Sequence, residues 1–190
     1  MVSVSGVRGR VGEALTPEIV STFAAGFGAW ASARSAPGGA RVVVGRDSRV
    51  SGPMFHRVVL AALQSVGCTV VDVGLTTTPT CQLAVEHHRA AGGLMISASH
   101  NPIEWNALKF IGPSGLFLEA HEGAEMRAAM ERGVALATWD RLGTIDTDGG
   151  AFQRHIDLVL ALPFLDVEGI RKRRFRVAID ACHGAGGAIM

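Results

Sequence analysis

A strand, a helix and a second strand follow one another between residues 41 and 73, and this unit constrains the fold most strongly. Arg41-Val-Val-Val-Gly45 is a run of β-branched residues, a pattern typical of a strand that is buried on both faces. A helix with one apolar stripe is expected at 53–66, and another apolar strand at 69–73. Two strands joined by a helix in this way are usually parallel with a right-handed crossover. The unit therefore predicts an α/β fold.

A second helical segment is expected before this unit. Thr16-Pro17 has the residue types of an N-cap followed by the first helical position. Apolar residues then recur at helical spacing as far as Trp30, and Pro37-Gly38-Gly39 ends the segment. Upstream, residues 4–10 predict a short strand that breaks into a loop, where glycines flank Arg8. Arg8 could reach a ligand there, or simply occupy a turn.

A polar segment, Ser97-Ala98-Ser99-His100-Asn101-Pro102, separates two further strand-like runs. The apolar run Gly92–Ile96 precedes it, and a second strand or hairpin is expected at 107–111, which carries Lys109. A polar loop at the end of a buried strand is a common place for chemistry. By residue type alone the segment could equally be an ordinary turn, because Ser, Asn and Pro favour turns.

A charged loop, Arg46-Asp47-Ser48-Arg49, directly follows the first of these strands. Open α/β sheets bind ligands beyond the carboxyl ends of their strands, so the loop lies where a ligand would be expected. Two interpretations stay open at this point. Arg49 approaches a substrate, or it pairs with Asp47 inside the loop.

The domain organisation follows from changes in composition. Helices expected at 78–88 and 119–132 complete a first domain at 1–140, and the polar, Gly-rich residues 141–150 predict a linker. The remainder, 151–190, is expected to contain a helix at 151–161, a strand at 175–179 and a turn. A strand and a turn cannot bury their own apolar face, so this part is expected to be the incomplete start of a second domain.

The composition limits the classes of function. Of the 190 residues 48% are hydrophobic and 18% are charged, which is typical of a globular protein, and the net charge is only +1. Neither nucleic acid nor a membrane is therefore an expected partner. Three widely spaced cysteines without a CxxC pair, and the absence of a signal-peptide pattern, predict a cytoplasmic protein.

The loop at 97–102 gives the chain a family resemblance. Together with Trp105-Asn106-Ala107-Leu108-Lys109, it resembles the active-serine loop of the α-D-phosphohexomutases, the family of phosphoglucomutase, phosphomannomutase and phosphoglucosamine mutase. Gly6-Val7-Arg8-Gly9 and Gly45-Arg46-Asp47-Ser48-Arg49 are also similar to motifs of that family, and the stretch from Asp180 to Gly187 is similar to the opening of its second domain. The resemblance covers essentially the whole chain, but only the first of four family domains and the start of the next.

The resemblance implies a fold and a reaction. The expected fold is α/β, with a mixed, mostly parallel sheet and helices on both faces, followed by the start of a similar α/β domain. The family interconverts hexose 1-phosphate and hexose 6-phosphate through a phosphoserine, here Ser99, and a hexose 1,6-bisphosphate. Mg²⁺ is the implied cofactor and would bind Ser99 through its phosphate, with carboxylates from a loop that these residues lack. The chain alone is therefore expected to lack turnover.

The resemblance also implies roles for further residues. Arg8 and Lys109 would neutralise the phosphate, and Lys109 could act as general acid or base. His100 would hydrogen-bond the phosphate or the incoming oxygen. Arg49 and Asn101 complete the expected phosphate- and substrate-binding set, although Asn101 could instead hold the loop in shape.

Two other functions remain as alternatives. A serine hydrolase would use Ser97 or Ser99 as an acyl nucleophile, but its strand–Gly-x-Ser-x-Gly–helix elbow is not in the sequence. A non-catalytic module that binds phosphosugars is the other alternative. The choice among glucosamine, mannose and glucose, and the oligomeric state, are left open by these residues.

Overall fold

The computed structural model of the chain describes residues 2–3, 6–36 and 39–188, and within these residues it contains one sheet of seven strands. The strand order is β1-β2-β6-β5-β3-β4-β7. The strands are β1 (Val2–Ser3), β2 (Gly6–Arg10), β3 (Arg41–Arg46), β4 (Thr69–Leu75), β5 (Gly92–Ile96), β6 (Trp105–Ile111) and β7 (Ile145–Thr147). Residues 4–5 of the strand expected at 4–10, and Pro37-Gly38 of the expected helix stop, lie outside the described residues.

The sheet is mixed, with most strands running in one direction. The pairs β3–β4, β3–β5 and β4–β7 are parallel, whereas β6 is antiparallel to both β5 and β2. Because β2 opposes β6, it runs in the same direction as the four parallel strands. Only β6 and β1 run the other way. The expected α/β fold with a mixed, mostly parallel sheet is confirmed.

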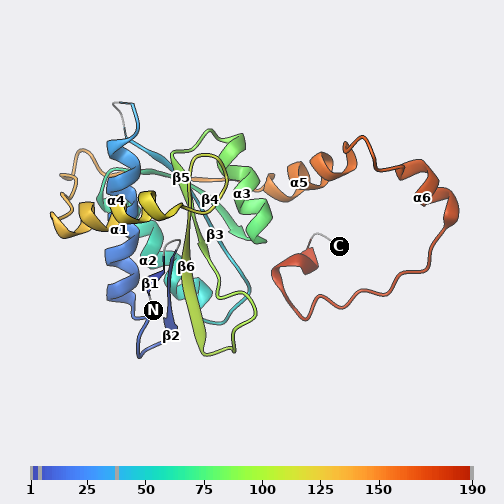
Figure 1. The fold of residues 1–190 in the computed structure, drawn as a ribbon, viewed down its shortest axis with the longest axis horizontal. Coiled ribbons are helices and arrows are strands. Elements are labelled where there is room, and N and C mark those ends of the chain that lie inside the picture. Colours follow the sequence, from blue (N-terminus) through green and yellow to red (C-terminus); the bar gives the residue numbers. More distant parts are fainter. Residues whose placement is uncertain (1, 4–5, 37–38, 189–190) are drawn as a thin grey trace.

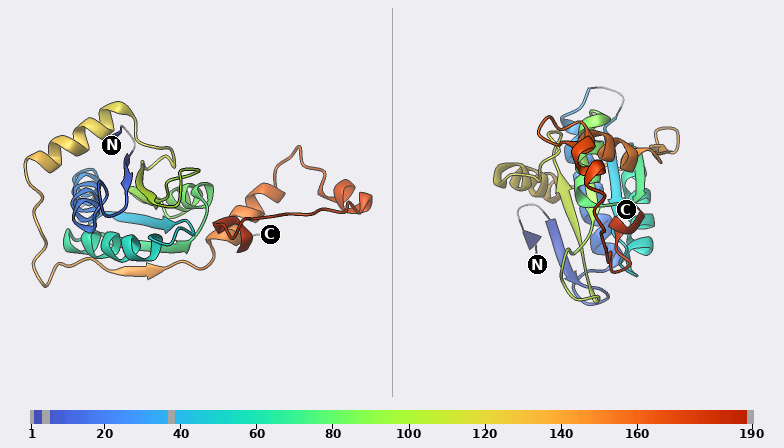
Figure 2. Two further views of the ribbon diagram at one scale, coloured as in Figure 1. Left: turned by 90° about the horizontal axis from the view of Figure 1, so that it is seen from below. Right: turned by 90° about the vertical axis from the view of Figure 1, so that its right-hand side faces the viewer.

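Helices cover both faces of the sheet (Figures 1 and 2). Those of the described residues are α1 (Pro17–Ala33), α2 (Gly52–Ser65), α3 (Thr78–His87), α4 (Ala120–Glu131), α5 (Ala151–Leu160), α6 (Val167–Arg173) and a short 3-10 turn (Ala185–Ala188). The left-hand view of Figure 2 shows α1 and α2 on one side of the sheet, and α3 and α5 toward the other. No helix in the described ranges has the length and apolar character needed to cross a membrane.

The β-branched run in β3 supplies both hydrophobic cores, because alternate side chains of a strand point to opposite faces. Val42 and Val44 pack with α1 and α2 in the larger core, whereas Val43 belongs to the smaller core beneath α3. All three are fully buried, as the sequence pattern predicts. In the larger core the ring of Phe27 stacks on Phe110 with centroids 5.3 Å apart.

Local capping chemistry sets the starts of two helices. Thr16 is the N-cap of α1, where its hydroxyl accepts a hydrogen bond from the backbone N–H of Ile19, and Pro17 follows it as expected. Thr77 caps α3 in the same way, with its hydroxyl 3.3 Å from the backbone nitrogen of Thr80. The start of α3 therefore lies directly after the carboxyl end of β4.

The segment expected to be a linker contributes a strand instead. Residues 145–147 form β7, which extends the sheet beyond β4. Gly143 leads into it, exchanging hydrogen bonds with Gln64 of α2 and lying so close to the Cys68 backbone that no side chain would fit. The sheet thus continues past residue 140. The division into 1–140, 141–150 and 151–190 stays a prediction of the sequence.

The last part of the chain differs from expectation in one element. The helix expected at 151–161 is present as α5, but residues 175–179 form no strand. They run apart from the sheet (Figure 1), with Phe175, Val177 and Ile179 exposed. A strand requires a neighbouring backbone to satisfy its N–H and C=O groups, and no described strand lies beside this segment. The prediction of a strand at 175–179 is wrong for this structure.

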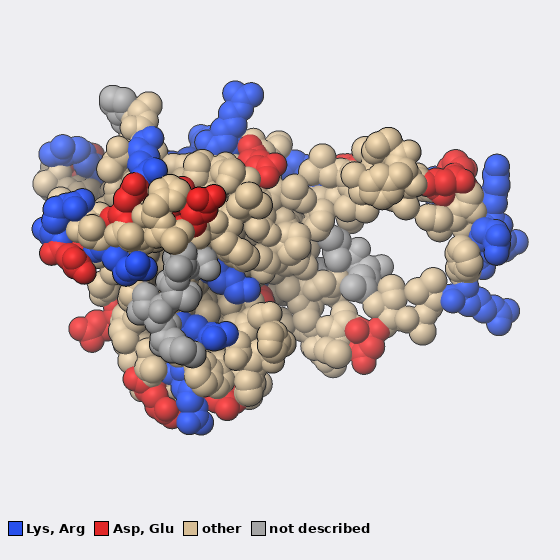
Figure 3. Space-filling view, viewed as in Figure 1, with Lys and Arg blue, Asp and Glu red and all other residues tan. Residues whose placement is uncertain are grey.

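Charged side chains are mixed over the surface. Figure 3 shows acidic and basic groups interspersed over the face that it presents. A basic group lies at the far end, where the last turn of α6 carries Arg171, Lys172 and Arg173. This distribution fits the net charge of +1.

Candidate active site

The loop at 97–102 lies at the carboxyl end of β5, next to the carboxyl end of β3. The backbone N–H of Ser97 donates to the carbonyl of Ala107, so the loop starts within the β5–β6 pair. The backbone N–H of Asp47 donates to the carbonyl of Ile96, which ties the segment after β3 to the end of β5. The loop and the segment 46–49 therefore meet at the sheet edge where α/β folds bind ligands.

Two side chains shape the loop from inside. The hydroxyl of Ser97, which is 5% exposed, accepts a hydrogen bond of 3.1 Å from the backbone N–H of Ser99. The side-chain amide of Asn101 donates to the carbonyl of Ala98 at 2.7 Å. Asn101 thus holds the loop in shape, which was one of its two expected roles. A contact of Asn101 with substrate stays a prediction.

Ser99 is presented at the outer tip of the loop. It is exposed, and its φ of 58° lies in the left-handed region that few residues other than glycine adopt. Its hydroxyl oxygen lies 3.4 Å from Nδ1 of His100, which is also exposed. Ser99 and His100 are therefore brought together, with the hydroxyl accessible to a reactant.

Arg49 contacts the loop backbone rather than the solvent. Its Nη1 donates to the carbonyls of Pro102 and Trp105 at 2.8 and 3.0 Å, and its Nη2 donates to those of Ser99 and Asn101 at 2.8 and 2.7 Å. Each terminal nitrogen of a guanidinium has two N–H groups, so all four have partners. The expected contact of Arg49 with phosphate would require the release of at least one carbonyl, and it stays a prediction.

Asp47 orients Arg49. One carboxylate oxygen accepts a hydrogen bond from the Arg49 backbone N–H at 3.1 Å, and the other forms an ion pair with Nε at 3.3 Å. The side chains of Arg49 and Asp47 are only 11% and 18% exposed. The internal Arg–Asp pair, one of the two interpretations of the sequence, is therefore present.

Two cations lie on the same face of the neighbouring strands. Arg8 of β2 is opposite Ala107 of β6, and Lys109 is two residues further along β6, so both side chains point to one side of the sheet. Arg8 is exposed and lies within β2, not in the loop that the sequence predicts. Lys109 is half-buried, and its ammonium lies 5.7 Å from the centroid of the Phe117 ring.

The surroundings of Lys109 make its charged form less favourable than it is in water. Burial lowers the pKa of Lys109, and the positive charges of Arg49 and Arg8 lower it further, whereas Asp47 opposes them. Lys109 is thus electrostatically coupled to Arg8, Arg49 and Asp47. A lysine with a lowered pKa is suited to accept and return a proton.

A cavity of about 350 Å³ lies between the loop and the ends of the neighbouring strands. The residues that line it are Asp47, Ser48, Arg49, Thr76, Thr77, Thr78, Met95, Ser97, Ser99, Gly184 and Ala185. Sequence reasoning did not assign Thr76–Thr78 to the site. The signal was available, because these residues follow the carboxyl end of β4 as Asp47–Arg49 follow that of β3. The hydroxyl of Thr76 is buried and has no hydrogen-bond partner.

The residues of this site do not form a magnesium site by themselves. The described residues include no group of three or more His, Cys, Asp or Glu side chains placed to hold a metal. Asp47, a carboxylate of the cavity wall, is already engaged by Arg49. A phosphate on Ser99 would provide one hard oxygen ligand, and the other ligands would have to come from elsewhere.

The geometry disfavours acyl transfer of the hydrolase type. A nucleophile elbow joins a strand to a helix through a tight turn. Here the loop joins β5 to a second strand, β6. The strand–turn–helix arrangement that such an enzyme needs is therefore missing at Ser97 and Ser99.

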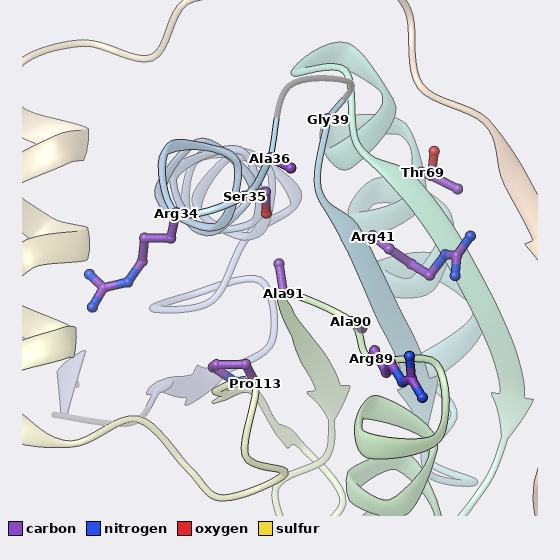
Figure 4. Close-up of a pocket in the computed structure, with 10 residues that line it drawn as sticks. All are labelled: Arg34, Ser35, Ala36, Gly39, Arg41, Thr69, Arg89, Ala90, Ala91 and Pro113. Atoms are coloured by element: carbon purple, nitrogen blue, oxygen red, sulfur yellow. The ribbon is translucent and has the colours of Figure 1, made fainter.

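A larger cavity, of about 560 Å³, lies at the amino ends of the parallel strands, away from the Ser99 loop (Figure 4). It is bordered by Gly39 and Arg41 at the start of β3, and by Thr69 at the start of β4. In Figure 4 the side chain of Arg34 points away from those of Arg41 and Arg89, so the three do not point toward a common point. They form no convergent anion site, and the cavity is remote from the Ser99 loop.

Comparison with known proteins identifies the family. Residues 2–135 match the family model described as "Phosphoglucomutase/phosphomannomutase, alpha/beta/alpha domain I". The chain belongs to this family. The resemblance found in the Ser99 loop is thereby confirmed.

Curated relatives carry the names of phosphohexomutases. The chain is 37% identical over 184 residues to the phosphoglucomutase/phosphomannomutase of Thermococcus kodakarensis, and 38% identical over 183 residues to the phosphoglucosamine mutase of a Synechococcus species. Each alignment includes 95% of this chain, but only 39% and 37% of the respective relative. The chain thus spans well under half the length of these proteins.

Solved structures support the fold. A putative phosphomannomutase from Thermus thermophilus superposes with a TM-score of 0.70 at 30% identity, over 85% of this chain and 36% of the other. A phosphoglucomutase from Paramecium, at 18% identity, superposes with a TM-score of 0.74 over 98% of this chain and 39% of the other. At that identity the second match bears on the fold alone.

Proposed function

We propose that this chain is the serine-bearing part of a phosphohexomutase, which interconverts hexose 1-phosphate and hexose 6-phosphate. In this proposal Ser99 carries a phosphate, transfers it to the sugar to give a hexose 1,6-bisphosphate, and takes back the other phosphate. The observation that carries the proposal is an exposed serine hydroxyl on a loop that is hydrogen-bonded from several sides. Membership of the mutase family supports the same reaction.

The charges around the loop suit a phosphoserine. A serine phosphate has a charge near −2 at neutral pH, so it needs cations nearby. Arg8, Arg49 and Lys109 are electrostatically coupled at this sheet edge, as the lowered pKa of Lys109 reflects. Phosphoryl transfer depends mainly on positioning and on neutralising charge, and this site provides both.

Each transfer step breaks one oxygen–phosphorus bond and forms another. The bond from Ser99 Oγ to phosphorus breaks as a sugar oxygen bonds to phosphorus, the proton of the sugar hydroxyl passes to a base, and the released Ser99 oxygen takes up a proton to become a hydroxyl. Lys109 in its neutral form is the proposed base, and in the reverse step it returns the proton. His100, whose Nδ1 lies 3.4 Å from the Ser99 hydroxyl oxygen, would hydrogen-bond the phosphate in this proposal.

Mg²⁺ remains the proposed cofactor. When bound to a phosphate oxygen on Ser99, it would supply further charge neutralisation for the transferred group. Since the described residues provide no carboxylate cluster, the proposal assigns those ligands to a part of the protein outside these 190 residues. For the same reason, the chain alone is proposed to lack turnover.

Phosphopeptide mapping tests the proposal. Trypsin cleaves after Arg89 and Lys109, so Ser97 and Ser99 fall in one peptide, 90–109, whose fragment ions distinguish them. The full-length protein incubated with a hexose 1,6-bisphosphate and Mg²⁺ should carry phosphate on Ser99 and not on Ser97. Phosphate on Ser97 alone, or on neither serine, would refute the proposed carrier.

A turnover assay distinguishes the proposed mutase from the alternative, a non-catalytic module that binds phosphosugars. The full-length protein should convert hexose 1-phosphates to hexose 6-phosphates, and comparing glucosamine, mannose and glucose phosphates would identify the sugar. Binding of these compounds without conversion would support the module instead. The proposed compartment is the cytoplasm, in keeping with the free thiols of Cys68, Cys81 and Cys182.

A further inference from the structure

The Ser99 loop has an unusual source of backbone hydrogen bonds. A loop without regular structure leaves carbonyl groups that need partners, and here one guanidinium serves those of Ser99, Asn101, Pro102 and Trp105. These residues span most of the chain between β5 and β6. A single side chain therefore connects both arms of the loop.

The donor comes from a different element than the loop that it binds. Arg49 lies 50 residues before Ser99, in the segment that follows β3. Asp47 fixes its direction by accepting from its backbone N–H and pairing with Nε. Burying a guanidinium is unfavourable unless its charge and its donors have partners. The Asp47 carboxylate balances the charge and the four carbonyls accept from the terminal N–H groups, whereas the buried Nε forms no hydrogen bond.

The loop also contains local strain that these contacts must offset. Ser99 has a φ of 58°, and left-handed backbone is strained at a residue other than glycine. Charge-assisted hydrogen bonds contribute more than neutral ones, and two of the four contacts are to the carbonyls of Ser99, the strained residue itself, and of Asn101, two residues after it. The contacts therefore lie where they stabilise this conformation most directly.

We propose that Arg49 is a positioning residue that fixes the backbone of the Ser99 loop, and thereby the direction in which the Ser99 hydroxyl is presented. Arg49 acts through the loop carbonyls and not by binding the sugar phosphate. The functional part of this inference rests on the proposed phosphoserine at Ser99. The conformational part does not.

The proposal requires a guanidinium and not only a positive charge. Lysine has one ammonium on a flexible stem, and its three N–H groups diverge from a single atom. It cannot reach four carbonyls that are arranged about two separate nitrogens. Arg49→Lys therefore keeps the charge beside Asp47 but loses most of the contacts, which separates positioning from electrostatics.

Amide hydrogen exchange of the 190-residue chain tests the conformational part. The backbone N–H groups of Ser99, Asn101 and Trp105 have partners within the loop and should exchange at least about tenfold faster in Arg49→Lys and Arg49→Gln. The amide of Val43 in β3 should be unchanged, which shows that the fold persists. Arg57→Gln, at an exposed arginine of α2, is the matched control and should leave the loop as in the wild type. Unchanged loop exchange in both Arg49 variants would overturn the proposal.

Kinetics of the full-length protein test the functional part. Loss of positioning should lower kcat in Arg49→Lys by at least about tenfold with little change in KM, whereas loss of a substrate contact would raise KM. Added guanidinium ion should partly restore the rate of Arg49→Gly but not that of Ser99→Ala. A wild-type rate in Arg49→Lys would overturn the positioning role.

The two proposals fail in distinguishable ways. Faster loop exchange in the Arg49 variants, together with a wild-type protein that never carries phosphate on Ser99, would refute the proposed function and leave the positioning role intact. Phosphate on Ser99 with loop exchange that does not respond to Arg49 would refute the positioning role alone.

Discussion

The hydroxyl of Ser97 accepts a hydrogen bond from the backbone N–H of Ser99, at 3.1 Å. The two serines are two residues apart in one loop, yet the first is buried and the second is exposed. The Ser97 hydroxyl is thus used inside the protein, whereas the Ser99 hydroxyl faces the medium. This relationship separates two residues that sequence reasoning had to treat as rival nucleophiles.

Substitution of the two serines should have very different effects on activity. In the full-length protein, Ser99→Ala removes the proposed phosphate carrier and should lower the turnover of hexose 1-phosphate by several orders of magnitude. Ser97→Ala removes one hydrogen bond of the loop, which is typically equivalent to about 1 kcal/mol, so the loss should be about tenfold or less. Steady-state assays of both variants check the ranking, and the reverse order would identify Ser97 as the carrier.

Asp148 should stabilise the junction between the sheet and α5. It follows β7, and its carboxylate accepts hydrogen bonds from His88, the C-cap of α3, at 2.7 Å, from Arg154 of α5, and from the backbone N–H of Gly150 at 2.9 Å. Burial alone would raise its pKa, but these hydrogen bonds lower the pKa of Asp148 from 3.8 to about 2. The charged form is therefore the one that the folded state favours.

Because the pKa of Asp148 is lowered in the folded state, its contribution to stability depends on pH. Because the pKa is lower in the folded state, the stabilisation is complete above pH 3.8 and is lost as the pH falls through 2. Asp148→Asn should lower the melting temperature at pH 7, and the difference from wild type should shrink below pH 4. Asp146→Asn, at an exposed residue of β7, is the matched control. A difference that persists unchanged at pH 2 would contradict this account.

The parts of the fold that the sequence predicts are those that local chemistry determines. Val42–Val44 are β-branched and form a strand buried on both faces, and Thr16-Pro17 starts a helix because its hydroxyl and ring suit the N-cap and first position. These preferences act over a few residues. They therefore do not depend on residues that are distant in the sequence.

The elements that the sequence does not predict depend on distant partners. β7 is a short run, Ile145-Asp146-Thr147, without an apolar pattern, and it is a strand because the edge of β4 offers it hydrogen bonds. Residues 175–179 have an alternating apolar pattern, but no described strand lies beside them, and they form none. Strand formation is decided by pairing, which a local pattern does not contain.

The site was predictable in its residues more than in its contacts. The family-like motifs single out Ser99, Lys109 and Arg8. The structure couples Lys109 with Arg8 across β6 and β2, and the Ser99 loop follows β5, the other neighbour of β6. The pairing of Arg49 with Asp47 was one interpretation of the sequence, but its four carbonyl partners could not be foreseen, because backbone carbonyls carry no sequence signature. A prediction from residue types favours side-chain partners, whereas this guanidinium binds main chain.

The rates at which the cysteine thiols are labelled test the packing of α3 on the sheet. Cys81 of α3 is fully buried, and burial raises the pKa of its thiol to about 12, while burial also raises that of Cys68. Cys182 is exposed. At pH 8 a thiol reagent should label Cys182 rapidly, the other two only slowly, and all three at once in urea. Cys182→Ser should abolish the rapid phase. Rapid native labelling of Cys81 would mean that α3 does not pack as described.

Lys109 should affect stability and activity in opposite directions. Burial lowers the pKa of its ammonium from 10.5, so between the folded-state pKa and 10.5 the unfolded chain binds more protons, and stability rises with pH across that window. At pH 7 the charged side chain therefore destabilises the fold. Lys109→Met should raise the melting temperature at pH 7, and this gain should narrow as the pH approaches 10.5.

The same substitution should lower the transfer rate of the full-length protein by about 10²-fold or more, because Lys109 is the proposed proton acceptor. Lys172→Met, at an exposed residue of α6, should change neither the melting temperature nor the transfer rate. A melting temperature that falls in parallel with activity in Lys109→Met would make Lys109 a structural residue. A rate that stays at the wild-type value would assign the proton transfer to another group, and His100, beside the Ser99 hydroxyl, would be the next to substitute.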